Sequence, residues 1–196
     1  MAKREVCNKC LRPLKVCYCR SINLFRPNSK ILILRDHKEK LHPFNTARIA
    51  ELSLDSCTVL DTDSKDFSSK LEEFINEYSP CLIFKKEDSK PLEENLSKLD
   101  SKNFILLDGT WSKAKKILFT NPSLQSLTTY HLNPRHQTVY KSLRKACGEE
   151  FVSTFEAVLE TLELIDDLTE EQREKVITPL KYVVKQQEEI KKGPNK

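Results

Sequence analysis

Four short apolar runs, separated by segments with helical character, constrain the fold of this chain more than any other feature. The runs cover residues 30–35, 57–60, 81–84 and 104–107. Continuous apolar runs of this length are typical of strands that are buried on both faces of a sheet. Helical patterns occur at residues 46–54, 67–78 and 91–99, the last of which Pro91 would open. With a fifth strand at residues 128–132, the chain is predicted to be α/β, with a mostly parallel sheet and helices on both faces.

The C-terminal third has the pattern of two long amphipathic helices. One apolar stripe holds Phe151, Phe155, Val158, Leu159, Leu162 and Ile165, and the other holds Val176, Ile177, Leu180, Val183 and Val184. These helices are expected to close a single catalytic domain over residues 29–190, since 196 residues suffice for one sizeable core. A basic leader at residues 1–28 would precede it, and a flexible tail at residues 191–196 would follow.

Four of the seven cysteines lie near the N-terminus, in the pattern Cys7-x2-Cys10-x6-Cys17-x-Cys19. Four thiolates form a complete tetrahedral ligand set for structural zinc, with no position left for a catalytic water. The pattern therefore predicts a compact zinc knuckle with a structural role. The remaining cysteines lie among apolar neighbours and are expected to be buried core thiols: Cys57, Cys81 and Cys147.

Positive charge is concentrated in the same part of the chain. Residues 1–50 hold 12 Lys and Arg against 3 Asp and Glu, whereas residues 51–196 hold 21 against 26. Such a region is typical of proteins that bind the phosphate backbone of nucleic acids, and ordinary solvated side chains are the alternative. The candidate RNA-binding residues are Arg12, Lys15, Arg20 and Arg48.

Several function classes are not expected from the composition. The apolar runs are too short for a transmembrane helix, and no signal peptide follows the basic N-terminus, so we expect no membrane contact. Seven cysteines without a secretory signal indicate a reducing, cytoplasmic location. The three glycines are too widely spaced for a GxGxxG motif or a P-loop, so a nucleoside triphosphate enzyme is not expected.

The fourth apolar run ends in Asp108-Gly109-Thr110-Trp111, which is the best candidate for the edge of an active site. Ligands of parallel sheets bind at the carboxyl ends of the strands, where Asp108 would lie. Gly109 would allow a close approach of the backbone to a ligand. Ser112 is expected to cap the helix that follows. The alternative is a plain strand-to-helix turn with Trp111 in the core.

Together these motifs resemble those of the DTW-domain family, the tRNA-uridine aminocarboxypropyltransferases of the SPOUT superfamily. Asp108–Trp111 is similar to the family's Asp-x-Thr-Trp signature, and residues 10–19 resemble its zinc-binding leader. Residues 45–48, Asn-Thr-Ala-Arg, resemble its Asn-Thr-x-Arg element. Its two later segments are matched by Tyr140-x3-Arg144-Lys145 and by Ser153-Thr154-Phe155-Glu156-Ala157.

One segment departs from the family pattern. Members often carry His-Pro-x-Glu after the first strand, whereas this chain has Asp36-His37-Lys38-Glu39 followed by His42-Pro43. The roles of His37, Glu39 and His42 therefore stay open.

The resemblance implies transfer of the 3-amino-3-carboxypropyl group of S-adenosylmethionine to N3 of a uridine in tRNA. It also implies structural zinc and the SPOUT trefoil knot. The sulfonium activates three adjacent carbons, so the orientation of the cofactor decides the product. Uridine N3 must lose a proton, which the catalytic residue Asp108 would accept or position; alternatively, Asp108 would hold the methionine amino group. Two other functions stay open: a SPOUT-type RNA methyltransferase, and a zinc-containing RNA-binding protein without catalysis.

The resemblance also implies a cofactor-binding set, namely Gly109, Thr110, Trp111, Arg144, Ser153, Thr154 and Glu156. Trp111 would wall the pocket or stack on a base. Arg48 and Arg144 suit a cofactor carboxylate or an RNA phosphate, because a guanidinium binds either one through two parallel hydrogen bonds. His131 and His136 are expected to be ordinary loop histidines. Both a monomer and a dimer are compatible with the sequence.

Overall fold

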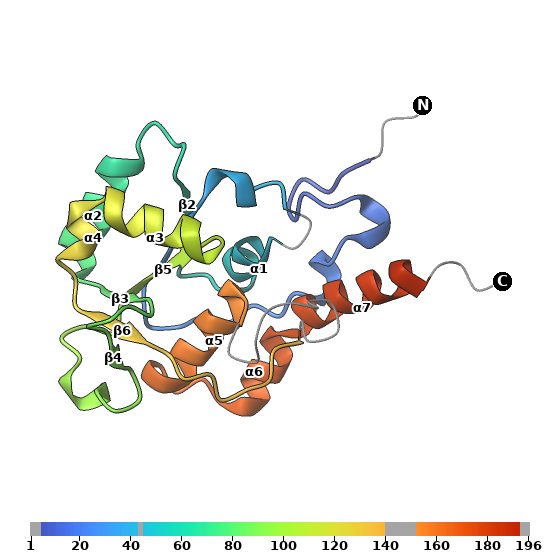
Figure 1. Cartoon of the computed structure of the whole chain (residues 1–196). Coiled ribbons are helices and arrows are strands. Elements are labelled where there is room, and N and C mark those ends of the chain that lie inside the picture. Colours follow the sequence, from blue (N-terminus) through green and yellow to red (C-terminus); the bar gives the residue numbers. More distant parts are fainter. Residues whose placement is uncertain (1–4, 43–44, 140–151, 193–196) are drawn as a thin grey trace.

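The computed structural model describes residues 5–42, 45–139 and 152–192. At its centre is a six-stranded sheet in the order β2-β1-β5-β3-β6-β4, in which all pairings are parallel (Figure 1). The strands are β1 Ile31–Arg35, β2 Cys57–Asp61, β3 Cys81–Ile83, β4 Lys90–Pro91, β5 Phe104–Asp108 and β6 Thr129–His131. The α/β fold and the five strands predicted from the sequence are confirmed, and β4 is an addition.

Seven α-helices surround the sheet in the described part of the chain: α1 Thr46–Ser53, α2 Phe67–Tyr78, α3 Trp111–Thr120, α4 Pro122–Gln125, α5 Thr154–Ile165, α6 Glu170–Val176 and α7 Thr178–Lys192. Four short 3-10 turns are η1 Leu14–Val16, η2 Cys19–Ser21, η3 His37–Glu39 and η4 Leu96–Lys98. None of the described helices is both long enough and apolar enough to cross a bilayer.

Alternate residues of the central strands face two separate cores. In β1, Ile31 and Ile33 pack in a core with α1, α5, α6 and α7, whereas Leu32 and Leu34 pack in a core with α2, α3 and α4. Helices therefore cover both faces, as the sequence predicts. Phe104 of β5 and Phe155 of α5 are both fully buried in the first core, which fixes the start of α5 against β5.

Three local predictions are wrong. Residues 91–99 form no α-helix, because Leu92 is fully buried and its N–H donates to the carbonyl of His131 beside the β4 edge. Ser112 is not a helix cap, since α3 begins at Trp111 with Thr110 in the N-cap position. The C-terminal region holds three helices instead of two, because the second predicted stripe is divided at Ile177, which ends α6, and Pro179 lies in the first turn of the next helix.

The N-terminal leader packs on the body of the protein and not as a separate lobe. Cys10 and Tyr18 belong to the core that contains α1 and α7, and the Asn23 side chain donates to the carbonyl of Lys175 at 2.9 Å. In Figure 1 the leader lies beside α7. The division of the chain at residues 28 and 190 stays a prediction, as does the trefoil knot.

Candidate active site

Asp108 is the last residue of β5 and lies in register with Arg35 of β1 at the carboxyl edge of the sheet. Its side chain is buried, with 8% exposure, and accepts a 2.5 Å hydrogen bond from Oγ1 of Thr154 at the start of α5. Burial raises the pKa of Asp108, while the Thr154 hydrogen bond opposes that shift. The structure therefore brings together the predicted residues Asp108 and Thr154 in a site suited to proton transfer.

Glu39 and Asp36 form the rim of this site with Lys113 of α3. The ammonium of Lys113 lies 2.6 Å from Glu39 Oε1 and 3.5 Å from Asp36 Oδ1, and the pairing with Glu39 raises the pKa of Lys113. A Cβ atom on Gly109 would lie 3.0 Å from Cβ of Lys113, so glycine fits where α3 approaches this segment. Glu39 thus ties η3 to α3, whereas the His37 side chain is half exposed.

Arg35 organises a polar cluster that the sequence analysis missed. Its guanidinium donates to Asp61 Oδ1 at 2.6 Å and to Asn45 Oδ1 at 3.0 Å. Asn45 Oδ1 also accepts from the N–H of Arg48 and so caps α1. The only sequence signal was a pair of opposite charges, Arg35 and Asp61, at the ends of two apolar runs. This cluster fixes α1 to the sheet edge that carries Asp108.

The four basic residues predicted to bind RNA have different surroundings. Arg48 binds the carbonyl of Lys9 through Nε and Nη2, and pairs with Glu51, so it fastens the leader to α1. Lys15 and Arg20 are exposed, whereas Arg12 is half-buried. An RNA contact by any of the four stays a prediction.

Trp111 is not part of the core, so that alternative is wrong. The residue is 47% exposed, and its ring stacks on that of Phe84 after β3, with ring centroids 4.9 Å apart. Lys115 places its ammonium 5.3 Å from the same ring centroid. Thr110 lies beside it, with its hydroxyl 3.4 Å from that of Ser112. The two residues thus form an aromatic and hydroxyl-bearing surface at the turn that follows Asp108 in the sequence.

Ser153 and Glu156 hold the start of α5 in a reciprocal capping box. The Glu156 carboxylate also accepts from the N–H of Val139 at 2.8 Å and from Oγ1 of Thr138 at 3.1 Å. Because these donors engage both oxygens of Glu156, it positions backbone around the site, and its predicted contact with a cofactor is untested. Arg144 lies outside the described residues.

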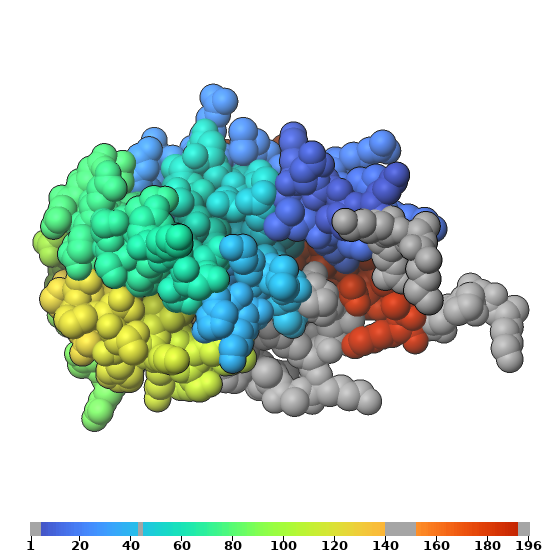
Figure 2. Space-filling model, turned by 90° about the horizontal axis from the view of Figure 1, so that it is seen from above, coloured from blue at the N-terminus to red at the C-terminus, as the bar shows by residue number. Residues whose placement is uncertain are grey.

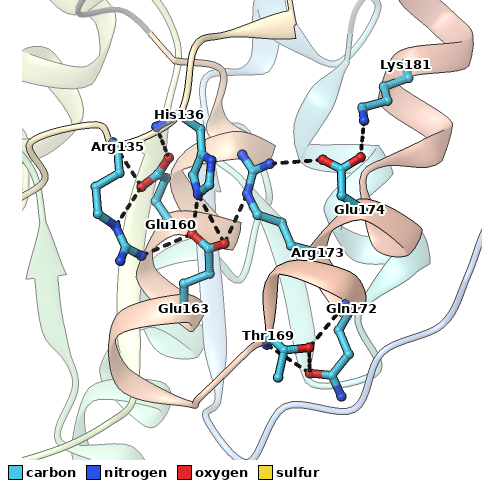
Figure 3. A network of polar contacts seen from close by, with 9 residues as sticks. All are labelled: Arg135, His136, Glu160, Glu163, Thr169, Gln172, Arg173, Glu174 and Lys181. Atoms are coloured by element: carbon cyan, nitrogen blue, oxygen red, sulfur yellow. Dashed lines mark hydrogen bonds and ion pairs between the residues drawn. The ribbon is translucent and has the colours of Figure 1, made fainter.

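A second buried carboxylate, that of Glu160, lies one turn further along α5. Together with Glu163 it binds residues 135–136, and we call these contacts the clamp (Figure 3). Glu160 accepts from the N–H groups of Arg135 and His136, at 3.3 and 3.1 Å. Glu163 lies 3.1 Å from Arg135 Nη2, 3.0 Å from His136 Nε2 and 3.4 Å from Arg173 Nε. His136 is therefore not an ordinary loop histidine. Although His136, Glu160 and Glu163 cluster closely enough for a cation, the two arginines already balance the two carboxylates.

We expect Glu160→Ala to lower the free energy of unfolding by about 3 kcal/mol, because it removes the buried carboxylate that accepts from the N–H groups of Arg135 and His136 and pairs with Arg135 Nε. Glu72→Ala, which truncates an exposed glutamate of α2, is the matched control and should change stability by about 0.5 kcal/mol or less. Urea unfolding measures both. Equal effects of the two substitutions would contradict the clamp.

The four N-terminal cysteines form a cluster of the size that zinc needs. Their Sγ atoms all lie within 4.8 Å of one another, with Cys7 to Cys19 at 3.7 Å and Cys10 to Cys17 at 3.6 Å. A tetrahedron with zinc–sulfur bonds of about 2.3 Å has sulfur–sulfur edges of about 3.8 Å. The six described cysteines are all free, and Cys57 and Cys81 are buried, as predicted; Cys147 lies outside the described residues.

The ionisation of these thiols favours a bound cation. Backbone N–H groups of Cys10 and Lys9 lower the pKa of Cys7 to about 6, whereas burial raises the pKa values of Cys10 and Cys19. Four thiolates in contact repel one another, so a divalent ion is what would allow all of them to ionise together. The donor set and its spacing therefore fit zinc.

Comparison with known proteins agrees with this geometry. The profile of the DTW domain matches residues 4–188, which include the cysteine cluster, Asp108 and α5. The chain belongs to the DTW-domain family. It is 28% identical over 194 residues to a Drosophila melanogaster protein named tRNA-uridine aminocarboxypropyltransferase 2, with 94% of this chain and 76% of the relative covered.

A second relative carries the same name. The Mus musculus tRNA-uridine aminocarboxypropyltransferase 2 is 29% identical over 130 residues, which cover 61% of this chain and 43% of that protein. No solved structure shows a significant match to the chain.

Proposed function

We propose that this DTW protein transfers the 3-amino-3-carboxypropyl group of S-adenosylmethionine to N3 of a uridine in tRNA, giving 3-(3-amino-3-carboxypropyl)uridine. The observation that carries the proposal is the buried Asp108–Thr154 pair at the carboxyl edge of the sheet, within the sequence that defines the family. The names of the fly and mouse relatives support the same activity.

Alkylation of uridine N3 requires one proton acceptor, and Asp108 has this role in the proposal. The N3 proton moves to the Asp108 carboxylate, N3 forms a bond to the terminal carbon of the aminocarboxypropyl chain, and the bond from that carbon to sulfur breaks. The sulfur keeps the electron pair, and methylthioadenosine leaves. Because burial raises the pKa of Asp108, its carboxylate is a stronger base than an exposed aspartate. Thr154 fixes the carboxylate through its hydroxyl.

Three residues that follow Asp108 belong to the proposed cofactor site. Trp111 presents an exposed ring at the turn after Asp108, and Thr110 and Gly109 offer a hydroxyl and a close approach of the backbone. Arg144, which the family resemblance assigns to the cofactor, belongs to this proposal on that resemblance alone. The enzyme would work in the cytoplasm, where the described cysteines stay reduced.

Zinc has a structural role in this proposal. Cys7, Cys10, Cys17 and Cys19 would hold it, because their four sulfur atoms have the spacing of a closed tetrahedral site. Bound there, the ion would neutralise the thiolates and fix the basic leader for contact with tRNA. Arg12, Lys15 and Arg20 belong to that leader, and Arg48 anchors it.

Nucleoside mass spectrometry tests the function. The purified protein is incubated with unmodified bulk tRNA and S-adenosylmethionine, and the digested nucleosides are analysed. We expect an aminocarboxypropyl increment on uridine. A methyl increment would instead identify a methyltransferase, and tight tRNA binding without any increment would identify a binding protein.

A further inference from the structure

A cavity of about 740 Å³ separates the leader from the C-terminal helix, and nothing described so far assigns it a role. The cavity lies between the cysteine knuckle, residues 40–42, Asn45, α1 and α7. In Figure 2 the dark blue leader, the light blue segment near residue 40 and the red α7 lie around the same region of the surface. Its volume is within the range of about 300–1,000 Å³ that is common for ligand pockets.

The lining combines apolar walls with positive charge. Ile49 of α1 and Val183 of α7 are buried and supply apolar wall surface. Arg12 and Lys15 supply two cations, and the lining also holds His42 and Lys40, whose ammonium pairs with Asp61 at 3.0 Å. Among the lining residues that the structure describes, Glu5 is the one carboxylate, so the cavity suits a ligand with an apolar ring and a negative group.

Two polar atoms in this lining have no partner within the described chain. The Tyr18 hydroxyl is buried in a side chain with 3% exposure, and Nη1 of Arg12 is also buried. A buried donor without an acceptor costs about 1–3 kcal/mol, so such groups call for a ligand. Both atoms are hydrogen-bond donors, and a nucleotide carries carbonyl and phosphate acceptors.

The cavity also adjoins the edge of the sheet that carries Asp108. Asn45, which lines the cavity, accepts a hydrogen bond from Arg35, and Arg35 is paired in register with Asp108. His42 lines the cavity as well, and it lies close enough to Asp108 to affect the pKa of that carboxyl. A ligand in the cavity would therefore lie beside the site proposed for transfer.

We propose that this cavity receives an unstacked nucleotide of the tRNA, with its base against Ile49 and Val183, a base carbonyl at the Tyr18 hydroxyl and its phosphate facing Arg12 and Lys15. The inference rests on the proposed function, because a uridine must leave its stack before N3 can be reached. The positive lining favours the phosphodiester over S-adenosylmethionine, which carries a net positive charge.

The Tyr18→Phe variant tests the contact without disturbing the fold. The hydroxyl has no partner among the described residues, so its removal should leave the melting temperature unchanged or higher. We expect the dissociation constant for unmodified bulk tRNA to rise about five- to tenfold, which is the effect of one lost hydrogen bond. Zinc content and the affinity for S-adenosylmethionine should match those of the wild type.

A second variant fills the cavity from α7. Gln187 lines the cavity, whereas its neighbour Gln186 is not among the lining residues and hydrogen-bonds to Glu189. We expect Gln187→Trp to weaken tRNA binding at least tenfold and to lower product formation in parallel, because the indole occupies the space of a base. Gln186→Trp is the matched control and should bind like the wild type.

Each outcome has a definite meaning, since the wild type is assayed for product in the same experiment. If it forms the modified uridine while Tyr18→Phe and Gln187→Trp bind tRNA normally, the cavity proposal is overturned and the proposed function stands. If the variants lose affinity for S-adenosylmethionine instead of tRNA, the cavity holds the cofactor and the proposal is again wrong. If the wild type forms no product, the proposed function fails, whereas weaker tRNA binding by both variants would still support the cavity.

Discussion

Asp108→Asn is expected to lower the rate of aminocarboxypropyl transfer by about 10²- to 10⁴-fold, the usual contribution of a positioned proton acceptor. An amide cannot accept the N3 proton, but its oxygen can still accept the hydrogen bond from Thr154. Product per unit time is measured by nucleoside mass spectrometry. Asp63→Asn, an exposed aspartate in the loop after β2, is the matched control and should retain full activity.

The two roles left open for Asp108 give different results in this variant. A base acts on the chemical step, so kcat should fall while the dissociation constant for S-adenosylmethionine stays unchanged. A partner of the methionine amino group would instead weaken cofactor binding. Isothermal titration with S-adenosylmethionine separates the two, and a fully active Asp108→Asn enzyme would exclude both.

Stability provides an internal control for the same substitution. Because the folded pKa of Asp108 is raised above its unfolded value of about 3.9, the folded state binds the proton more tightly. Asp108 therefore destabilises the fold progressively as pH rises from about 4 through its raised folded pKa. Asp108→Asn should melt at a higher temperature than the wild type at pH 7, with the difference shrinking as pH falls toward 4. Lost activity with a higher melting temperature would exclude unfolding as the cause.

The alternation of apolar runs and amphipathic segments was enough to predict the layered sheet, because both signals are local. The prediction of a helix at residues 91–99 was wrong for a physical reason. The proline and the helix-forming residues there suit a helix, but Leu92 is buried and its N–H donates to the carbonyl of His131, which excludes the helical conformation. Tertiary packing overrides propensity in such a short segment. The sequence has no local signal for that contact.

The residues of the candidate site could likewise be predicted only in part. Asp108 and Thr154 could be predicted because each lies in a motif that resembles the family's, whereas Arg35 and Glu160 could not. Their partners are separated from them by tens of residues, so no spacing pattern connects them. Arg48 has a structural contact that its motif did not suggest, since its guanidinium binds the Lys9 carbonyl, and its RNA contact stays a prediction.

Loss of the proposed zinc site should have the largest structural effect. We expect Cys17→Ser to lose nearly all of the one zinc ion per chain, because three thiolates and a hydroxyl are a poor substitute for four thiolates. Metal binding supplies about 10–16 kcal/mol of folding free energy in small zinc-binding peptides, so the leader should not fold without it. Elemental analysis of the purified protein measures the loss. Cys57→Ala removes a buried thiol of β2 and should keep its zinc.

The body of the protein should survive this substitution, because its two cores are built around the sheet and its helices. Unfolding of the leader would nevertheless withdraw Cys10 and Tyr18 from the face of α1 and α7, and would displace Arg12 from the cavity. We therefore expect tRNA affinity to fall with zinc content while affinity for S-adenosylmethionine is kept. Stoichiometric zinc in Cys17→Ser would refute the ligand assignment, and normal tRNA affinity in a zinc-free protein would show that the leader does not contact tRNA.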